Sequence, residues 1–385
     1  MPTPSHAPMP SHSELNGFLT VDPGNLLLRR DAFHAALRER LWDAASVHIE
    51  AMRQDATLPA PQLRLLSAEL LMAQEHWAQA GELLAEALAE STQAPPELQE
   101  QLAVHLSFVL MKRGDFGGAK QALDIFVRGD ASKSGSSAKR QWLRATHFSG
   151  ELDEALAACK AWDLQRALAG DLLGSAAMVA LDSGDSALAL AWSNRALSNG
   201  PDVAALIVRG TIQLGAGEQA GAQQTVAEAI RLAPMEGRGW SLMAFVAMQA
   251  RDFSGARQAF DKALELQPSH IGTWHGRAWL NVMQDELQAA KSDFEAAMNL
   301  DRNFAETHGG LGVVAAMAGD AREANAHVER AERLSRNCAS AQYAKLLLRG
   351  QGKDAARVTA LAKAIVARSL RQEPGASAPD GTSLH

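Results

Sequence analysis

A small residue followed by two alanines recurs along this chain at intervals of about 34 residues. In each copy the first alanine comes twelve residues after the small residue, and the second comes seven residues later. The best-formed copies are Ala177/Ala189/Ala196, Gly210/Ala222/Ala229, Ala244/Ala256/Ala263, Ala278/Ala290/Ala297 and Gly312/Ala324/Ala331. A fixed period of this length indicates one supersecondary unit that buries its apolar face only by stacking on copies of itself. We therefore expect a repeat solenoid, whose extended surface is suited to holding another molecule.

Each unit reads as two short helices with a turn between them. In residues 237–270 the first helix places Trp240, Met243, Ala244 and Ala247 at i, i+3, i+4 and i+7, which is the spacing of one helical face. The second helix carries Phe253, Ala256, Phe260, Ala263 and Leu264 on one face, and Pro268 ends it because proline lacks the amide donor. The small residues allow the two helices to approach closely where they cross.

This pattern resembles the tetratricopeptide-repeat family, whose motif has an early tryptophan, a small eighth residue, a Gly-Asp type of turn, then Ala, an aromatic residue, Ala and Pro. In one copy those places are filled by Trp240, Ala244, Asp252, Phe253, Ala256, Phe260, Ala263 and Pro268. The resemblance runs from Leu26 to Arg371 and is strongest between Gly170 and Asn337. It implies an all-α, right-handed superhelical solenoid of about nine to ten helical hairpins.

Three copies depart from the motif, since Phe33, Leu143 and Leu346 occupy the eighth place. Terminal units of a solenoid are expected to be atypical because their outer faces meet water, which accounts for Phe33 and Leu346. Leu143 is internal and follows the Ser/Gly-rich stretch 128–139, which has no apolar anchor. We read that stretch as a linker or hinge, with a simple exposed loop as the alternative.

These breaks divide the chain into six parts. The N-terminal 1–22, rich in Pro, Ser and His, is predicted to be disordered, as is the tail 373–385. Between them we expect N-terminal repeats over 23–127, the linker or hinge 128–139, the main array 140–338 and a degenerate capping repeat over 339–372.

Charge and cysteine content narrow the function classes. The net charge is −7, but residues 339–385 hold seven Lys/Arg against three Asp/Glu, so the rest carries about −11. That acidic body argues against nucleic acid as a partner. The basic end reads either as a solvated capping face or as a docking patch for an acidic partner, and self-association through this end is a further possibility. Two cysteines in different repeats, no long apolar span and no visible secretory signal favour a cytoplasmic protein without membrane insertion.

No catalytic or metal-binding pattern stands out. His270 and His275 do not share one helix face, and neither Cys159 nor Cys338 has a second cysteine at metal-ligand spacing. We therefore expect a protein that is not an enzyme and carries no cofactor or metal, since function has to be argued from a site.

The family resemblance implies a concave groove lined by the first helix of each hairpin. On that basis the partner-binding residues of the N-terminal half are Arg30, His34, Arg38, His105, Lys112, Arg140, Arg144 and His147. Those of the C-terminal half are Ile207, Thr211, Leu214, Phe245, Met248, His275, Trp279, Met283, Val313 and Met317. The first set alternatively forms a solvated rim, and the second alternatively belongs to the core, because apolar stripes at helical spacing are often buried.

Together these features predict a scaffold, adaptor or chaperone-like protein that binds a segment of a partner protein, apolar or amphipathic with an acidic flank, for assembly or secretion. The alternative is a regulatory protein that senses a ligand or peptide and closes about the internal hinge.

Overall fold

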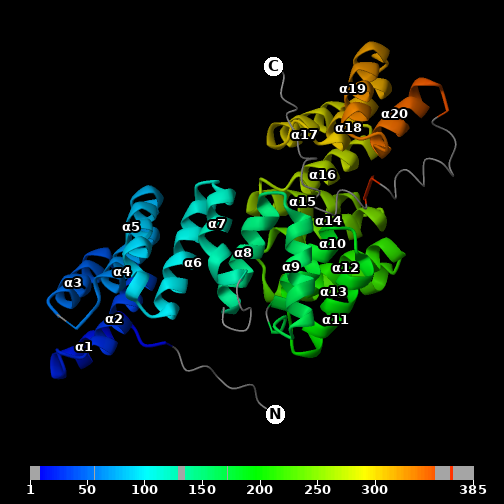
Figure 1. Cartoon of the computed structure of the whole chain (residues 1–385). Coiled ribbons are helices and arrows are strands. Elements are labelled where there is room, and N and C mark those ends of the chain that lie inside the picture. The colour runs from blue at the N-terminus through cyan, green and yellow to red at the C-terminus, as the bar shows by residue number, and fades with distance from the viewer. Residues whose placement is uncertain (1–8, 56, 129–134, 171, 352–364, 367–385) are drawn as a thin grey trace. The chain divides into compact units, whose positions relative to one another are not determined.

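The structure is a computed structural model that describes residues 9–55, 57–128, 135–170, 172–351 and 365–366. Among these residues it contains α-helices and one 3-10 turn but no strand, which confirms the expected all-α solenoid (Figure 1). The chain divides into two compact units, Met1–Ser149 and Gly150–His385. The predicted linker 128–139 lies partly on 129–134, outside the described residues, and its last residues begin a helix of the first unit.

The helices of the first unit are α1 (His12–Val21), α2 (Leu26–Arg38), α3 (Trp42–Arg53), α4 (Ala60–Ala73), α5 (Trp77–Glu90), η1 (Ser91–Gln93), α6 (Pro96–Lys112), α7 (Phe116–Val127) and α8 (Ser136–Phe148). Those of the second unit are α9 (Leu152–Leu164), α10 (Leu172–Asp182), α11 (Ser186–Ser198), α12 (Val203–Ala216), α13 (Gln219–Leu232), α14 (Gly237–Gln249), α15 (Phe253–Leu266), α16 (Ile271–Met283), α17 (Leu287–Leu300), α18 (Ala305–Met317), α19 (Ala321–Leu334) and α20 (Ala339–Leu348).

The turn inside each hairpin is built from a left-handed residue and a helix cap. Gly184 and Gly319 adopt positive φ angles of 84° and 82°, which a residue without Cβ adopts without strain. The next residue, Asp185 or Asp320, then accepts a hydrogen bond from the backbone N–H three positions later and so caps the second helix. The Gly-Asp signal in the sequence therefore sets where the chain reverses.

Successive hairpins interlock through a phenylalanine and a glycine. The rings of Phe260 on α15 and Phe294 on α17 are fully buried. A Cβ added at Gly276, on the first helix of the next hairpin, would lie 2.5 Å from Phe260 Cε1 and Cζ. Gly310 stands in the same relation to Phe294 one repeat later. The absence of a side chain on the following helix therefore makes the space that each ring fills.

The N-terminal segment differs from the prediction of disorder over 1–22. Residues 1–8 lie outside the described residues, but His12–Val21 form α1. Ser11 and Glu14 make a reciprocal capping box, and Leu15 and Leu19 are buried in a cluster with residues of α2. Local capping and two buried leucines offset the Pro- and Ser-rich composition that suggested disorder.

The C-terminal repeat is described only in part. Helix α20 packs on α18 and α19, and Leu346 is buried as a core residue. The remainder of the predicted capping repeat 339–372 lies outside the described residues except for 349–351, Ile365 and Val366, and the tail 373–385 lies outside them entirely.

Candidate functional site

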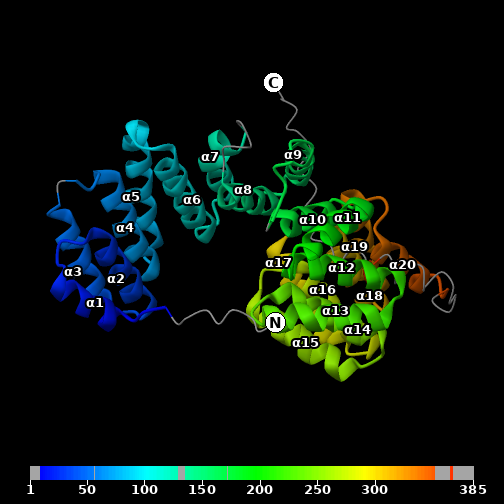
Figure 2. The same cartoon turned by 90° about the horizontal axis from the view of Figure 1, so that it is seen from below.

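The first helices of the hairpins form a row in each unit. In the second unit α10 packs on α12, α12 on α14, α14 on α16, and α16 on α18 (Figure 2). In the first unit α4 packs on α6, and α6 packs on α8. Side chains on one face of these helices therefore meet side chains from neighbouring hairpins, although they are about 34 residues apart in the sequence.

In the first unit this row brings two predicted residues together around a glutamate. Glu69 on α4 lies between His34 on α2 and His105 on α6, with its two carboxylate oxygens 3.0 Å and 3.4 Å from the histidine Nε2 atoms. All three side chains stay partly exposed. The sequence analysis missed Glu69, because no local pattern marks a residue whose partners lie one repeat away on either side.

The other predicted residues of this half also lie on first helices. Lys112 is exposed at the end of α6, with Nζ 5.7 Å and 5.6 Å from the ring centroids of Trp77 and Phe108. Arg38 is exposed at the end of α2, and one guanidinium nitrogen donates to the Pro10 carbonyl. The remaining four are the partly buried Arg30 and His147 and the exposed Arg140 and Arg144.

In the second unit most of the predicted residues are buried. Only Met283 and Met317 are exposed, at 54% and 36% of their surface. The buried ones are Ile207, Thr211, Leu214, Phe245, Met248, His275, Trp279 and Val313. The predicted residues of this half therefore do not form an open apolar surface. Phe245, for example, packs edge-on against Phe260 within its own hairpin.

Trp279 differs from the other buried residues of this set. Its ring is 9% exposed and packs edge-on against Phe294, with the Tyr343 ring centroid 6.2 Å away. Its indole Nε1 is buried and has no hydrogen-bond acceptor among the described residues. A buried tryptophan N–H normally has a partner, so this donor points to an acceptor that the described part of the chain does not supply.

His275 is a neutral core residue. It lies between the rings of Phe294 and Phe304, and its Nε2 is 2.7 Å from Thr307 Oγ1. Burial lowers the pKa of His275 to about 4, although the nearby Glu306 carboxylate acts in the opposite direction. The imidazole is therefore uncharged near neutral pH and links α16 to α18.

A buried ion pair adds a second link between first helices. The Arg238 guanidinium on α14 donates to both carboxylate oxygens of Asp182 on α10, at 3.1 Å and 3.2 Å. The Asp182 side chain is completely buried and that of Arg238 nearly so. The pair therefore joins two first helices that are two hairpins apart.

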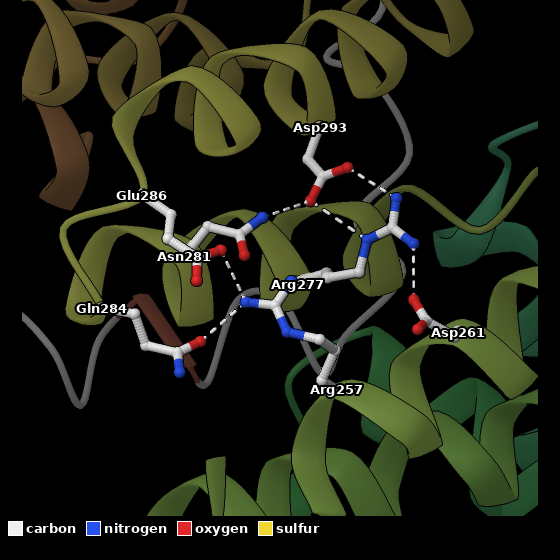
Figure 3. A network of polar contacts seen from close by, with 7 residues as sticks. All are labelled: Arg257, Asp261, Arg277, Asn281, Gln284, Glu286 and Asp293. Carbon is white, nitrogen blue, oxygen red and sulfur yellow. Dashed lines mark hydrogen bonds and ion pairs between the residues drawn. The ribbon is translucent and has the colours of Figure 1, made fainter. Parts of the chain in front are cut away.

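A polar network fixes α16 between its neighbours (Figure 3). Arg277 donates to Asp293 at 2.6 Å and 3.1 Å and to Asp261 at 2.7 Å, and its guanidinium lies 4.9 Å from the Trp274 ring centroid. Burial acts to lower the pKa of Arg277, but the hydrogen bonds to Asp293 and Asp261 outweigh it and raise that pKa. Asn281 also donates to Asp293, so these hydrogen bonds hold α15, α16 and α17 in register.

The second half of this network joins the same hairpins through another arginine. Arg257 on α15 donates to Gln284 and to Glu286, both at 2.8 Å, at the turn between α16 and α17 (Figure 3). These exposed contacts position the turn.

The described residues contain no group of three or more His, Cys, Asp or Glu arranged to hold a metal ion. No helix within the described ranges is long and apolar enough to cross a membrane. Burial raises the pKa of the Cys159 thiol to about 12, and the Asp163 carboxylate adds to the effect, so Cys159 remains a protonated core residue.

Comparison with known proteins supports the repeat assignment. The family model for the tetratricopeptide repeat matches residues 237–270. The crystal structure of the APC/C hetero-tetramer Cut9–Hcn1 contains a chain with 16% identity and a TM-score of 0.57, aligned over 94% of this chain and 76% of that one. A tetratricopeptide repeat protein from Parabacteroides merdae has 19% identity and a TM-score of 0.44 over 65% of this chain and 97% of its own. No curated protein matches the sequence significantly.

Proposed function

Because the chain belongs to the tetratricopeptide-repeat family, we propose that it is a non-enzymatic scaffold that holds a segment of a partner protein against the first helices of its hairpins. The segment is extended or helical, and it carries acidic residues beside an apolar or amphipathic stretch. Such a scaffold serves to assemble a larger complex or to deliver its partner elsewhere.

One observation carries this proposal. His34, Glu69 and His105 come from three successive hairpins and yet lie within hydrogen-bond or ion-pair distance while remaining partly exposed. An extended segment that crosses the hairpins therefore meets side chains of each first helix in turn. That arrangement suits recognition of a chain segment better than recognition of a small molecule, because the contacts are spread along the row.

The chemistry of the exposed residues indicates what the segment contains. Arg38 and Lys112 are exposed cations on first helices of the first unit, and each can donate to a carboxylate. Lys112 also lies beside two aromatic rings, which keep its ammonium group near the surface of α6. In the second unit the exposed Met283 and Met317 offer flexible apolar contacts, which suit an apolar stretch of variable sequence.

The test is selection of short random peptides on the immobilised full-length protein. We expect enrichment of acidic peptides that contain apolar residues. Their affinity should fall by at least about tenfold in Arg38→Glu plus Lys112→Glu, because one charge-assisted hydrogen bond is worth about 1.5–3 kcal/mol. Binding to the unaltered protein should also weaken as salt is added.

The matched control is Arg53→Glu plus Arg322→Glu, which makes the same change in charge at exposed residues of two second helices, α3 and α19. This variant should bind the selected peptides like the unaltered protein. An equal loss of peptide affinity in both variants would show that the effect depends only on the net charge of the protein. A selection that yields no acidic peptides would overturn the proposal.

A further inference from the structure

Two histidines of the α18–α19 hairpin face each other through the same ring nitrogen. His308 lies near the start of α18 and His327 in the middle of α19, and their Nδ1 atoms are 3.5 Å apart. The two helices pack side by side along the hairpin (Figure 1). His308 is 9% exposed and the side chain of His327 is 23% exposed, so the pair lies at the edge of the core, where an ion from solvent can reach it.

The separation of these two nitrogens is wider than that of an ordinary hydrogen bond. Hydrogen bonds from N–H groups in proteins span about 2.7–3.2 Å between the heavy atoms. A zinc ion bound by two imidazoles at about 2.0–2.1 Å in tetrahedral geometry holds the two nitrogens about 3.3–3.4 Å apart. The observed 3.5 Å therefore suits a metal ion between the rings better than a hydrogen bond between them.

The outer nitrogen of each ring has a contact that orients the ring as a metal ligand. His308 Nε2 lies 3.0 Å from the Arg302 carbonyl oxygen, which can only accept, so in the neutral ring Nε2 carries the hydrogen and Nδ1 the lone pair. His327 Nε2 lies 4.0 Å from Glu323 Oε1, to which Lys291 Nζ donates at 2.9 Å. Metal-binding histidines characteristically direct their other N–H at a carbonyl or a carboxylate.

The charge around His327 is compatible with a bound cation. Burial is the main reason why the pKa of His327 lies below its ordinary value, and His308 and Lys291 add to the effect. The ring is therefore neutral near pH 7, and neutral imidazole is the form that binds a metal ion. Glu323 and Glu295 act on this pKa in the opposite direction, so two carboxylates and one ammonium group influence the site. Together these three groups favour a cation between the rings.

A second pair of facing histidines, in the first unit, lacks these features. His12 Nε2 and His48 Nε2 are 3.1 Å apart, which is an ordinary hydrogen-bond distance. His48 is 3% exposed, and its Nδ1 has no partner among the described residues. No carbonyl or carboxylate of the described residues therefore orients this ring, and the pair is a hydrogen bond that joins α1 to α3.

We propose that His308 and His327 bind a zinc ion through their two Nδ1 atoms and that the ion joins α18 to α19. The remaining coordination positions of the ion are open to water. The site departs from the expectation of a chain without a metal, because the two histidines are nineteen residues apart and match no metal-binding spacing in the sequence. It is a property of this hairpin alone and does not depend on the proposed partner.

The test is titration of Zn²⁺ into the metal-free full-length protein, followed by amide hydrogen exchange of α18 and α19. An ion that joins the two helices should slow exchange in both. The Zn²⁺ concentration that gives half of this protection should rise at least about tenfold in His308→Ala and in His327→Ala, because loss of even an orienting partner weakens metal binding by about 10–100-fold. Mg²⁺ should give no protection, since it prefers oxygen ligands.

The matched control is His12→Ala, which removes one ring of the other histidine pair. In this variant Zn²⁺ should protect α18 and α19 as it does in the unaltered protein. His327 is partly exposed, so His327→Ala keeps the test valid even if His308→Ala disturbs the packing of α18. Each variant is compared with its own metal-free form, so a change in basal exchange does not enter the result.

Three outcomes would overturn the site. The first is equal Zn²⁺ protection of α18 and α19 in all four proteins, and the second is full protection in either His308→Ala or His327→Ala, because the ion needs both rings. The third is Zn²⁺ binding to the unaltered protein without protection of these helices, which would show an adventitious ion only. No partner is present in this experiment, so its outcome is separate from the peptide selection that tests the proposed function.

Discussion

Replacement of Gly276 by alanine tests how the hairpins interlock. The added Cβ would lie 2.5 Å from Phe260 Cε1 and Cζ and 2.6 Å from Phe245 Cζ. Carbon atoms in contact are normally about 3.5–4.0 Å apart, so the rings must move by about 1 Å. Phe260 is fully buried, Phe245 is 1% exposed, and the two rings already pack edge to face with centroids 5.2 Å apart, so neither has free space.

Two opposing contributions set how much Gly276→Ala changes the free energy of unfolding. Overpacking of a dense core costs about 1–3 kcal/mol, whereas exchange of glycine for alanine inside a helix stabilises it by about 1 kcal/mol. We therefore expect Gly276→Ala to destabilise the second unit by about 0–2 kcal/mol. Gly239→Ala is the matched control, since its Cβ would meet only Ile230 Cγ1, at an ordinary 3.4 Å. The control gains the same helix stabilisation without overpacking the core, so the free energies of unfolding of the two variants should differ by about 1–3 kcal/mol.

Urea unfolding followed by far-UV circular dichroism compares the midpoints of the two variants. Arrays of repeats can unfold in segments, so hydrogen exchange of α15 and α16 should accompany the global measurement. Gly276→Ala should unfold at a lower midpoint than Gly239→Ala and should loosen these two helices, whereas Gly239→Ala should not loosen them. A Gly276→Ala protein as stable as Gly239→Ala would refute the interlocking of Phe260 with the next hairpin.

Two further predictions concern buried charge. Asp182→Asn should destabilise the second unit by about 3 kcal/mol in urea unfolding, because it leaves the nearly buried Arg238 guanidinium without its anion. The double replacement Asp182→Leu with Arg238→Met should recover most of this loss, because it removes both charges. Equal losses in the two variants would contradict this explanation. His275 has a pKa of about 4 in the folded protein against 6.5 unfolded, so the unfolded chain takes up the proton first as the pH falls. The contribution of His275 to the free energy of unfolding should therefore decline by about 3 kcal/mol in total between pH 6.5 and pH 4. In His275→Gln the free energy of unfolding should change less over this pH range. Parallel pH profiles of the two proteins would show that His275 is accessible to protons when folded.

The register of the hairpins was predictable because its signals are local and periodic. Ala256 and Ala278 recur at the expected places and are fully buried. The turns at Gly184–Asp185 and Gly319–Asp320 have the Gly-Asp form of the repeat motif, since the positive φ angle and the helix cap depend only on adjacent residues. Both kinds of signal act within one repeat and need no knowledge of tertiary contacts.

Features that join different repeats were harder to predict. Gly276 and Gly310 lie sixteen residues after Phe260 and Phe294, a periodic signal that was present in the sequence but becomes meaningful only once the contact between hairpins is known. The bridging role of Glu69 depends on partners in two other hairpins and left no local trace.

Burial of the predicted partner-binding face was the least predictable feature. An apolar residue in the first helix has the same pattern whether it faces solvent, its own hairpin or another part of the chain. Phe245 is covered by its own hairpin, whereas Ile365 reaches the cluster of Trp279 from a segment that the repeat register assigns to the cap. At the N-terminus, composition suggested disorder although the Ser11–Glu14 capping box was visible in the sequence.

The central claim is that partner segments bind along the first helices of the hairpins. Photo-crosslinking tests it most directly, with a benzophenone amino acid placed in turn at Arg38, Lys112 and Arg53 and with a selected acidic peptide bound. The account predicts capture of the peptide from Arg38 on α2 and Lys112 on α6 and no capture from Arg53 on α3. Capture from Arg53 alone, or equally from all three positions, would contradict it.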